Sequence, residues 1–113
     1  MPSFLAQSGS FFQSPASPPI VNNVPTAGQT YTMAAGQREV YFNHPATIAS
    51  LTVKLPPGPR VGDTVSLKFR SIVTTLTVQN AAAVTVATAP VTASALQVQT
   101  YRYVDATTGW IYW

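Results

Sequence analysis

The sequence is short of charge and of the side chains that most often carry chemistry. Its 113 residues include no cysteine, one histidine, six Lys or Arg and three Asp or Glu. Without cysteine the chain has no disulfide, thiolate metal site or thiol nucleophile. Charged residues make up 8% of the chain, whereas about a quarter is usual in a soluble domain. A surface so poor in charge is weakly protected against association, which predicts a chain that works inside an assembly.

The net charge of +3 follows from this shortage of charge rather than from an abundance of basic residues. No apolar run approaches the roughly 18–20 residues that cross a membrane. Residues 1–20 also lack the positively charged start and the unbroken apolar stretch of a secretory signal. We therefore expect neither a membrane partner nor a cleaved leader.

The beginning of the chain differs in composition from the rest. No charged residue precedes Arg38, and half of the prolines lie before residue 26. Proline fixes φ, removes a backbone donor and favours extended conformations in the residue before it. We therefore predict that residues 1–28 form an extended, uncharged arm and that residues 29–113 form a separate domain.

Apolar residues recur along this arm between stretches of Ser, Gln, Pro and Asn. An extended arm buries little surface by itself, so its apolar residues suit the grooves of a neighbouring molecule. The candidate partner-binding anchors are Phe4, Leu5, Phe11, Phe12, Ile20 and Val21. The alternative is an arm that folds back along its own domain.

From residue 29 onward, apolar and polar residues alternate. Segments 51–55, 65–69 and 72–78 show this period of two and are rich in Val, Thr and Ile. Such alternation is typical of antiparallel strands with one buried face. Further strands are predicted at 29–33, 39–42, 84–87, 98–104 and 110–113, with a hairpin loop over 105–109. We predict an all-β fold, a small antiparallel β-sandwich or barrel of about seven short strands.

The residues that could carry catalysis show no recognisable constellation. The spacing of Glu39, Asp63 and Asp105 is not that of a catalytic carboxylate pair, and both aspartates fall in turns, where aspartate commonly binds backbone groups. His44 is followed by proline and has no nucleophile motif near it. The spacing of ligands that a metal needs is missing too. We predict a protein that is not an enzyme, with no catalytic, metal or cofactor site.

The C-terminal region is rich in aromatic residues, namely Tyr101, Tyr103, Trp110, Tyr112 and Trp113. Arg102 between two tyrosines is typical of proteins that stack single-stranded nucleic acid, but the basic residues are too sparse for a groove that follows phosphates. The same aromatic residues suit a protein interface or the face of a sugar ring. We favour an interface, keep glycan contact open and disfavour nucleic acid.

The order of these segments resembles a known group of proteins. LTVKLPP at 51–57 leads through VGD at 61–63 into VSLKF at 65–69, and IVTTLTV at 72–78 is followed by YRY at 101–103 and WIY at 110–112. Over residues 46–113 this order resembles small β-modules of tailed-bacteriophage virions: capsid decoration proteins, head fibres and tail-fibre domains. The resemblance implies a non-enzymatic structural role, usually as a trimer on the virion surface.

We therefore predict a virion structural protein, a capsid decoration or cement protein that attaches to the major capsid lattice through its N-terminal arm. Its expected location is the capsid surface, and its expected partners are the major capsid protein or other virion proteins and further copies of itself. The alternative is a phage fibre or receptor-binding module that contacts host glycan through the aromatic C-terminal hairpin.

Overall fold

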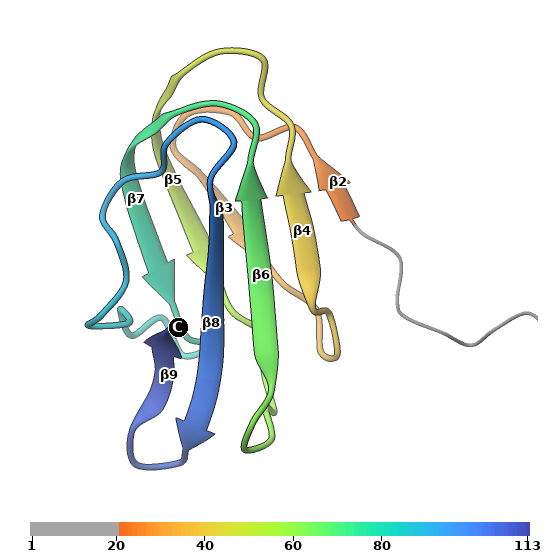
Figure 1. Ribbon diagram of the computed structural model, residues 1–113, viewed down its shortest axis with the longest axis vertical. Coiled ribbons are helices and arrows are strands. Elements are labelled where there is room, and N and C mark those ends of the chain that lie inside the picture. Colours follow the sequence, from red (N-terminus) through yellow and green to blue (C-terminus); the bar gives the residue numbers. More distant parts are fainter. Residues whose placement is uncertain (1–20) are drawn as a thin grey trace, which may run out of the picture.

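The computed structural model describes residues 21–113, which contain eight β-strands and no helix. The strands are β2 (Val21–Asn23), β3 (Gln29–Thr32), β4 (Glu39–Phe42), β5 (Ile48–Lys54), β6 (Thr64–Phe69), β7 (Val73–Gln79), β8 (Val98–Asp105) and β9 (Gly109–Tyr112). They form a five-stranded sheet in the order β2-β4-β6-β8-β9 and a three-stranded sheet in the order β3-β5-β7 (Figure 1). The prediction of an all-β fold of short strands is confirmed. Over the same residues, no helix exists that is long and apolar enough to cross a membrane.

From β2 to β8 the chain passes from one sheet to the other after every strand. As a result β2, β4 and β6 run in one direction, and β3, β5 and β7 run back in the other (Figure 1). Neighbours are therefore parallel, as in the register pairs Val40↔Leu67 and Leu51↔Leu76. Antiparallel pairing is confined to the C-terminal end, where β8 pairs with β6 and β9 with β8. The chain thus winds as a coil of parallel strands that ends in an antiparallel hairpin.

The predicted antiparallel arrangement is wrong for the strand pairs from β2 to β7. A period of two shows that one face of a strand is buried, but it does not show which way the neighbouring strand runs. Tight hairpins join antiparallel neighbours, whereas parallel neighbours need a crossover. Here each crossover is a strand of the opposite sheet. The predicted hairpin over 98–113 is confirmed, because β8 and β9 pair antiparallel across residues 106–108.

Both sheets contribute apolar side chains to one hydrophobic core. The alternating residues of β5 and β6 are buried as predicted, among them Leu51, Val53 and Leu67. Phe42 and Phe69 are register partners in β4 and β6, and their rings stack with centroids 5.2 Å apart. The core therefore depends on the parallel register, because that register places these two rings side by side.

The connection between β7 and β8 adds core residues without forming a strand. Val86 and Ala93 are buried, but the segment pairs with β7 through isolated bridges, one of which joins Thr85 to Gln79, and not through a continuous ladder. The side chain of Asn80 accepts two backbone N–H groups of the following residues, which holds the backbone in a turn. The strand predicted over 84–87 is therefore a loop.

The sheet begins earlier in the chain than the sequence indicates. β2 falls within residues 1–28, the predicted arm, yet it pairs with β4, as in Asn22↔Tyr41. A three-residue strand beside prolines shows no periodicity that could reveal it. Residues 21–28 thus belong to the β-domain. Of the predicted anchors, Val21 lies in β2, and the others lie outside the described residues: Phe4, Leu5, Phe11, Phe12 and Ile20.

Candidate functional site

The structure divides the five aromatic residues of the predicted contact set between core and surface. Tyr101 is fully buried and Trp110 is 6% exposed. Both side chains therefore pack in the core and expose almost no surface to a partner. Tyr103 is partly buried against the core, with its ring centroid 5.6 Å from that of Trp110. Tyr112 and Trp113 are 40% and 66% exposed. A contact made by the hairpin would therefore use these last two rings.

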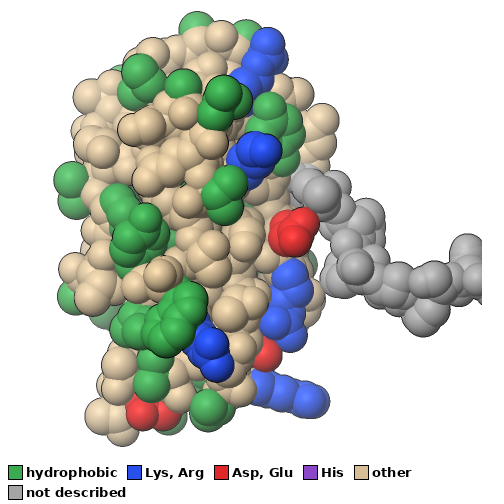
Figure 2. Space-filling model, viewed as in Figure 1, with side chains coloured by type: hydrophobic (Ala, Val, Ile, Leu, Met, Phe, Trp, Pro, Cys, Tyr) green, Lys and Arg blue, Asp and Glu red, His purple; other side chains and the backbone are tan. Residues whose placement is uncertain are grey.

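Trp113 lies beside Arg102 at the outer face of the five-stranded sheet. The central carbon of the Arg102 guanidinium is 5.0 Å from the centre of the Trp113 ring, and the Trp113 N–H donates to the carbonyl oxygen of Thr100 at 2.7 Å. A cation above an indole ring is attractive, so this contact holds the ring over β8. Figure 2 shows hydrophobic side chains gathered over the region of β8 and β9, next to a basic side chain.

A buried polar pair lies on the other face of β8. The hydroxyl of Tyr101 donates to Oε1 of Gln99 at 2.7 Å, and Nε2 of Gln99 donates to the carbonyl oxygen of Thr92 at 3.1 Å. Burial, and to a smaller extent the neighbouring Tyr112, raises the pKa of Tyr101. Tyr101 therefore stays neutral, and the pair ties the segment 80–97 to β8.

His44 is also part of the packing. It is 1% exposed, and its Nε2 lies 2.8 Å from the carbonyl oxygen of Ser71, which joins the end of β4 to the end of β6. Shielded in this way, His44 has no access to a substrate.

Asp105 accepts the N–H of Thr108 in the β8–β9 turn, which lowers the pKa of its carboxyl. Among residues 21–113 there is no group of three or more His, Asp or Glu that could hold a metal ion.

Two charged residues that precede parallel strands meet at one end of the sheets. Arg38 comes directly before β4 and Asp63 directly before β6. Parallel neighbours begin at the same edge of a sheet, and Arg38 Nη2 lies 3.2 Å from Asp63 Oδ1. The second carboxylate oxygen, Oδ2, accepts the backbone N–H of Arg60 at 2.9 Å. Both oxygens of Asp63 are therefore engaged by neighbouring donors.

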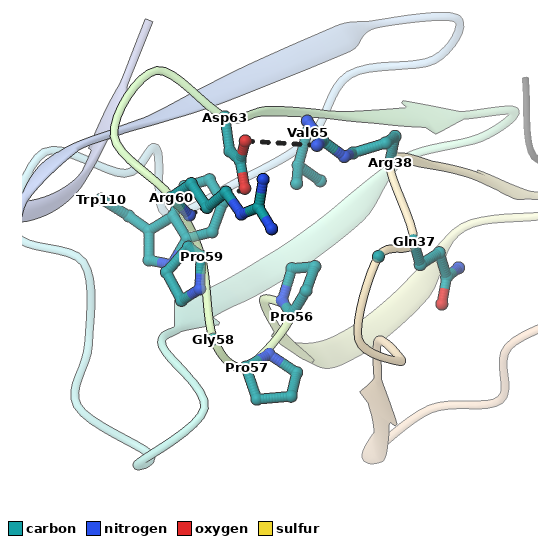
Figure 3. A pocket seen from close by; sticks show the side chains of 11 residues that line it. Gln37, Arg38, Pro56, Pro57, Gly58, Pro59, Arg60, Asp63, Val65 and Trp110 are labelled. Carbon is teal, nitrogen blue, oxygen red and sulfur yellow. Dashed lines mark hydrogen bonds and ion pairs between the residues drawn. The ribbon is translucent and has the colours of Figure 1, made fainter.

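A cleft of about 330 Å³ lies at this end of the molecule (Figure 3). Its lining combines the turn of residues 36–38, the proline-rich loop of residues 56–60, and the buried side chains of Val65 and Trp110. Figure 3 shows the side chains of Arg38 and Arg60 extending toward each other from opposite sides of the cleft. The arrangement places two cations over a partly apolar, proline-lined hollow.

Backbone hydrogen bonds hold both sides of the cleft in place. The N–H of Gly62 donates to the carbonyl of Tyr103 at 2.8 Å, and the N–H of Tyr103 donates to the carbonyl of Asp63 at 2.9 Å. On the other side, the N–H of Ser66 donates to the carbonyl of Arg38 at 2.9 Å. Gly62 has a φ of 91°, in the left-handed region that favours glycine. The two arginines therefore project from backbone that is fixed to the sheet.

The sequence alone does not identify Arg38 and Arg60 as site residues, although it places Asp63 correctly in a turn. The only available signal is that Arg38 and Asp63 each precede a strand, and this becomes informative only once the strands are known to be parallel. Comparison with known proteins adds no relative, since no family model, curated protein or solved structure matches the chain.

Proposed function

We propose that this chain is a non-enzymatic structural protein of a virion, a capsid decoration or cement protein on the capsid surface. In this proposal residues 1–20 bind the major capsid protein, and the β-domain of residues 21–113 associates with further copies of itself, as a trimer. The observation that carries the proposal is the way in which the chain enters the β-domain.

The chain enters through the short strand β2, at the edge of the five-stranded sheet. β2 has three residues, and β4 is its only partner among the described strands. The segment before Val21 thus joins the domain at an edge and not through the core. A partner can take up residues 1–20 without disturbing the packing of the other strands. An edge strand also presents backbone groups that a further chain can pair with.

The surface of the β-domain supports a role within an assembly. Thr30, Thr52 and Thr77 are register partners across the three-stranded sheet, and Lys54 is the only charged residue in its strands. Several large apolar side chains are more than half exposed: Val24, Val61, Val84, Val91, Leu96, Val98 and Trp113. A neutral surface with exposed apolar side chains favours contacts between copies.

The energetics of attachment set a requirement on the arm. Each buried Phe contributes about 1.5–3 kcal/mol, whereas ordering the backbone costs about 1–2 kcal/mol per residue. The paired anchors Phe4-Leu5 and Phe11-Phe12 concentrate apolar contact at two points of the arm. Attachment therefore needs main-chain hydrogen bonds to the partner in addition to these anchors.

Deletion of residues 1–14 tests the proposal. All described strands begin at or after Val21, so the truncated protein should keep its β-sheet circular dichroism and its thermal transition. It should no longer add to capsid particles that were assembled without it. In the full chain, replacement of Phe4, Leu5, Phe11 and Phe12 by Ser should have the same effect, whereas replacement of Ser3, Ser8, Ser10 and Ser14 by Ala should not. Unchanged occupancy of the truncated protein on the particles would refute attachment through the arm.

Self-association is tested separately by light scattering of the isolated protein. The proposal expects an oligomer, with the mass of a trimer, because the β-domain presents apolar side chains on a surface with little charge. A monomer at high micromolar concentration would contradict it.

A second candidate function is a fibre or receptor-binding module that contacts host glycan. The exposed rings of Tyr112 and Trp113 favour it, because Arg102 holds the Trp113 ring over β8 where a sugar could stack on it. Copy number separates the two functions: hundreds of copies per particle support decoration, and a few copies at the tail support a fibre module.

A further inference from the structure

We propose that the cleft of Figure 3, between the turn of residues 36–38 and the loop of residues 56–60, binds a saccharide unit that carries a carboxylate, such as a sialic or uronic acid. The lining residues of this site all lie within residues 36–110. It adds a ligand to the proposed structural role and does not depend on whether the protein decorates a capsid.

The charges of the cleft favour an anion. The ion pair between Arg38 and Asp63 is the only one that the structure shows among residues 21–113, so Arg60 has no acidic partner in that range. Asp63 already accepts hydrogen bonds on both oxygens, from Arg38 Nη2 and from the Arg60 N–H. Arg38 and Arg60 thus line the cleft with Asp63 as the only carboxylate among its lining residues, which leaves a net positive charge there. The fork of an arginine matches the two oxygens of a carboxylate and binds them with charge-assisted hydrogen bonds.

The position of the Arg60 guanidinium suits a bound ligand, because this group forms no salt bridge among residues 21–113. Figure 3 shows Arg60 extending into the hollow, opposite Arg38. The backbone N–H of Arg60 is fixed by Asp63 at 2.9 Å, so the base of this side chain is held while its end stays available. A carboxylate placed between the two arginines would replace no existing contact of Arg60.

The remainder of the lining favours a ring with apolar C–H groups over a small inorganic anion. Pro57 and Pro59 form the accessible apolar wall of the cleft, while Val65 and Trp110 are buried beneath it. The C–H groups of a pyranose ring pack on proline rings, while phosphate or sulfate would leave these rings uncovered. A volume of about 330 Å³ is at the lower end of the range of small-ligand sites, which suits a single sugar unit.

Hydroxyl groups of the sugar would find partners on the loop. Within residues 21–113, the N–H of Gly58 and the carbonyl of Pro57 form no hydrogen bond. Gly58 has a φ of 63°, so the loop turns sharply beside the cleft, and no side chain at this position covers the backbone. The cleft therefore offers a carboxylate site, an apolar wall and backbone groups for hydroxyls within one small volume.

Titration of the full-length protein with sialyllactose and with lactose, followed by calorimetry and by NMR shifts, tests the proposal. The two probes share the neutral disaccharide and differ in the carboxylated sugar. We expect sialyllactose, or a disaccharide ending in glucuronic acid, to bind about tenfold or more tightly than lactose, and the shifts to include the indole N–H of Trp110. Equal binding of lactose, or no binding of either carboxylated probe, would overturn the inference.

Variants of the arginines locate the site. R60Q should weaken binding of the carboxylated probe about tenfold to one-hundredfold, and R60K should retain part of the affinity because it keeps the charge but not the fork. R70Q is the matched control: Arg70 lies at the opposite end of β6, where it donates to Asn43, and its replacement should change nothing. An R60Q protein with unchanged affinity would refute the site. Equally tight binding of a glutamate-rich peptide would refute the choice of a saccharide.

The same variants keep this inference distinct from the proposed attachment. A protein lacking residues 1–14 should bind the carboxylated probe as the full chain does, and R60Q should add to particles as the wild type does. Failure of sugar binding therefore leaves the decoration proposal standing, and failure of decoration leaves the sugar site standing.

Discussion

Arg38 and Asp63 are 25 positions apart in the chain, yet Arg38 Nη2 lies 3.2 Å from Asp63 Oδ1. They meet because each directly precedes one of two parallel strands, β4 and β6. The opposite ends of the same strands show a matching contact, where Arg70 Nη1 lies 3.1 Å from Asn43 Oδ1. Polar side chains therefore mark both ends of the β4–β6 pair, and they do so because the strands run in the same direction.

The first prediction concerns this ion pair. Arg38→Ala should destabilise the protein by at most about 1 kcal/mol, because the pair is solvent-exposed and screened by water. Asp63→Ala should cost about 1–2 kcal/mol more than Arg38→Ala, because it also removes the acceptor of the Arg60 N–H at the turn. Urea denaturation of both variants measures the difference. Equal losses would show that the turn does not depend on the Asp63 carboxylate.

The second prediction tests the parallel register. Phe42 and Phe69 are fully buried and their rings stack at 5.2 Å. In a double-mutant cycle with Phe42→Leu and Phe69→Leu, we expect a coupling free energy of about 0.5–1.5 kcal/mol. Phe42→Leu combined with Ile111→Ala serves as the control, because β9 lies three strands away from β4 in the sheet. Additive losses for the phenylalanine pair would contradict the register.

The third prediction separates the two tryptophans of the hairpin. Trp110→Ala should cost about 3–5 kcal/mol of unfolding free energy, because it leaves a cavity in the core. Trp113→Ala should cost less than about 1 kcal/mol, since it removes only an exposed ring and its contact with Arg102. Thermal or urea denaturation distinguishes them. Similar losses for both would show that Trp113 is packed against the protein and not exposed.

The fourth prediction concerns alkaline pH. Burial raises the pKa of Tyr101 in the folded protein, whereas the tyrosine of an unfolded chain ionises near about pH 10. The folded state therefore holds this proton more tightly. The contribution of Tyr101 to stability is complete below about pH 10 and decreases as the pH rises further, by about 1 kcal/mol per pH unit.

Tyr101→Phe provides the control for this pH dependence. It lacks the ionisable hydroxyl but keeps the ring, so its stability should fall less steeply above about pH 10 than that of the wild type. Stability curves from urea denaturation at several alkaline pH values measure the two slopes. Identical slopes would show that another group is responsible.

The position of most strands could be predicted from the sequence. The predicted segment 39–42 coincides with β4, and 65–69 lies within β6. The prediction of 65–69 follows from a period of two, which is a local property of the chain. Strand β2 could not be predicted in this way, because three residues beside prolines show no periodicity. The segment 84–87 is the reverse case, because the sequence predicts a strand there and the structure has a loop. Its Val86 still packs in the core, and Asn80 and two isolated bridges hold the loop in place.

The candidate site was less accessible to prediction. The aromatic residues of the hairpin are evident in the sequence, but alternation places Trp110 and Tyr112 on the same face of β9 and so cannot tell which is buried. The structure covers Trp110 with the loop segments around it, whereas Tyr112 lies at the end of an edge strand. The cleft with Arg38 and Arg60 depends on contacts between distant segments, for which the sequence contains no local signal.

The sequence by itself determined an all-β chain without thiol chemistry, with an uncharged beginning, alternating strands and an aromatic hairpin at its end. These properties depend on composition and on neighbouring residues, which act before the chain folds. Only the tertiary structure decided that the strands alternate between two sheets and pair in parallel. That choice depends on which distant apolar faces pack together, and it is also what brings Arg38, Arg60 and Asp63 to one end of the molecule.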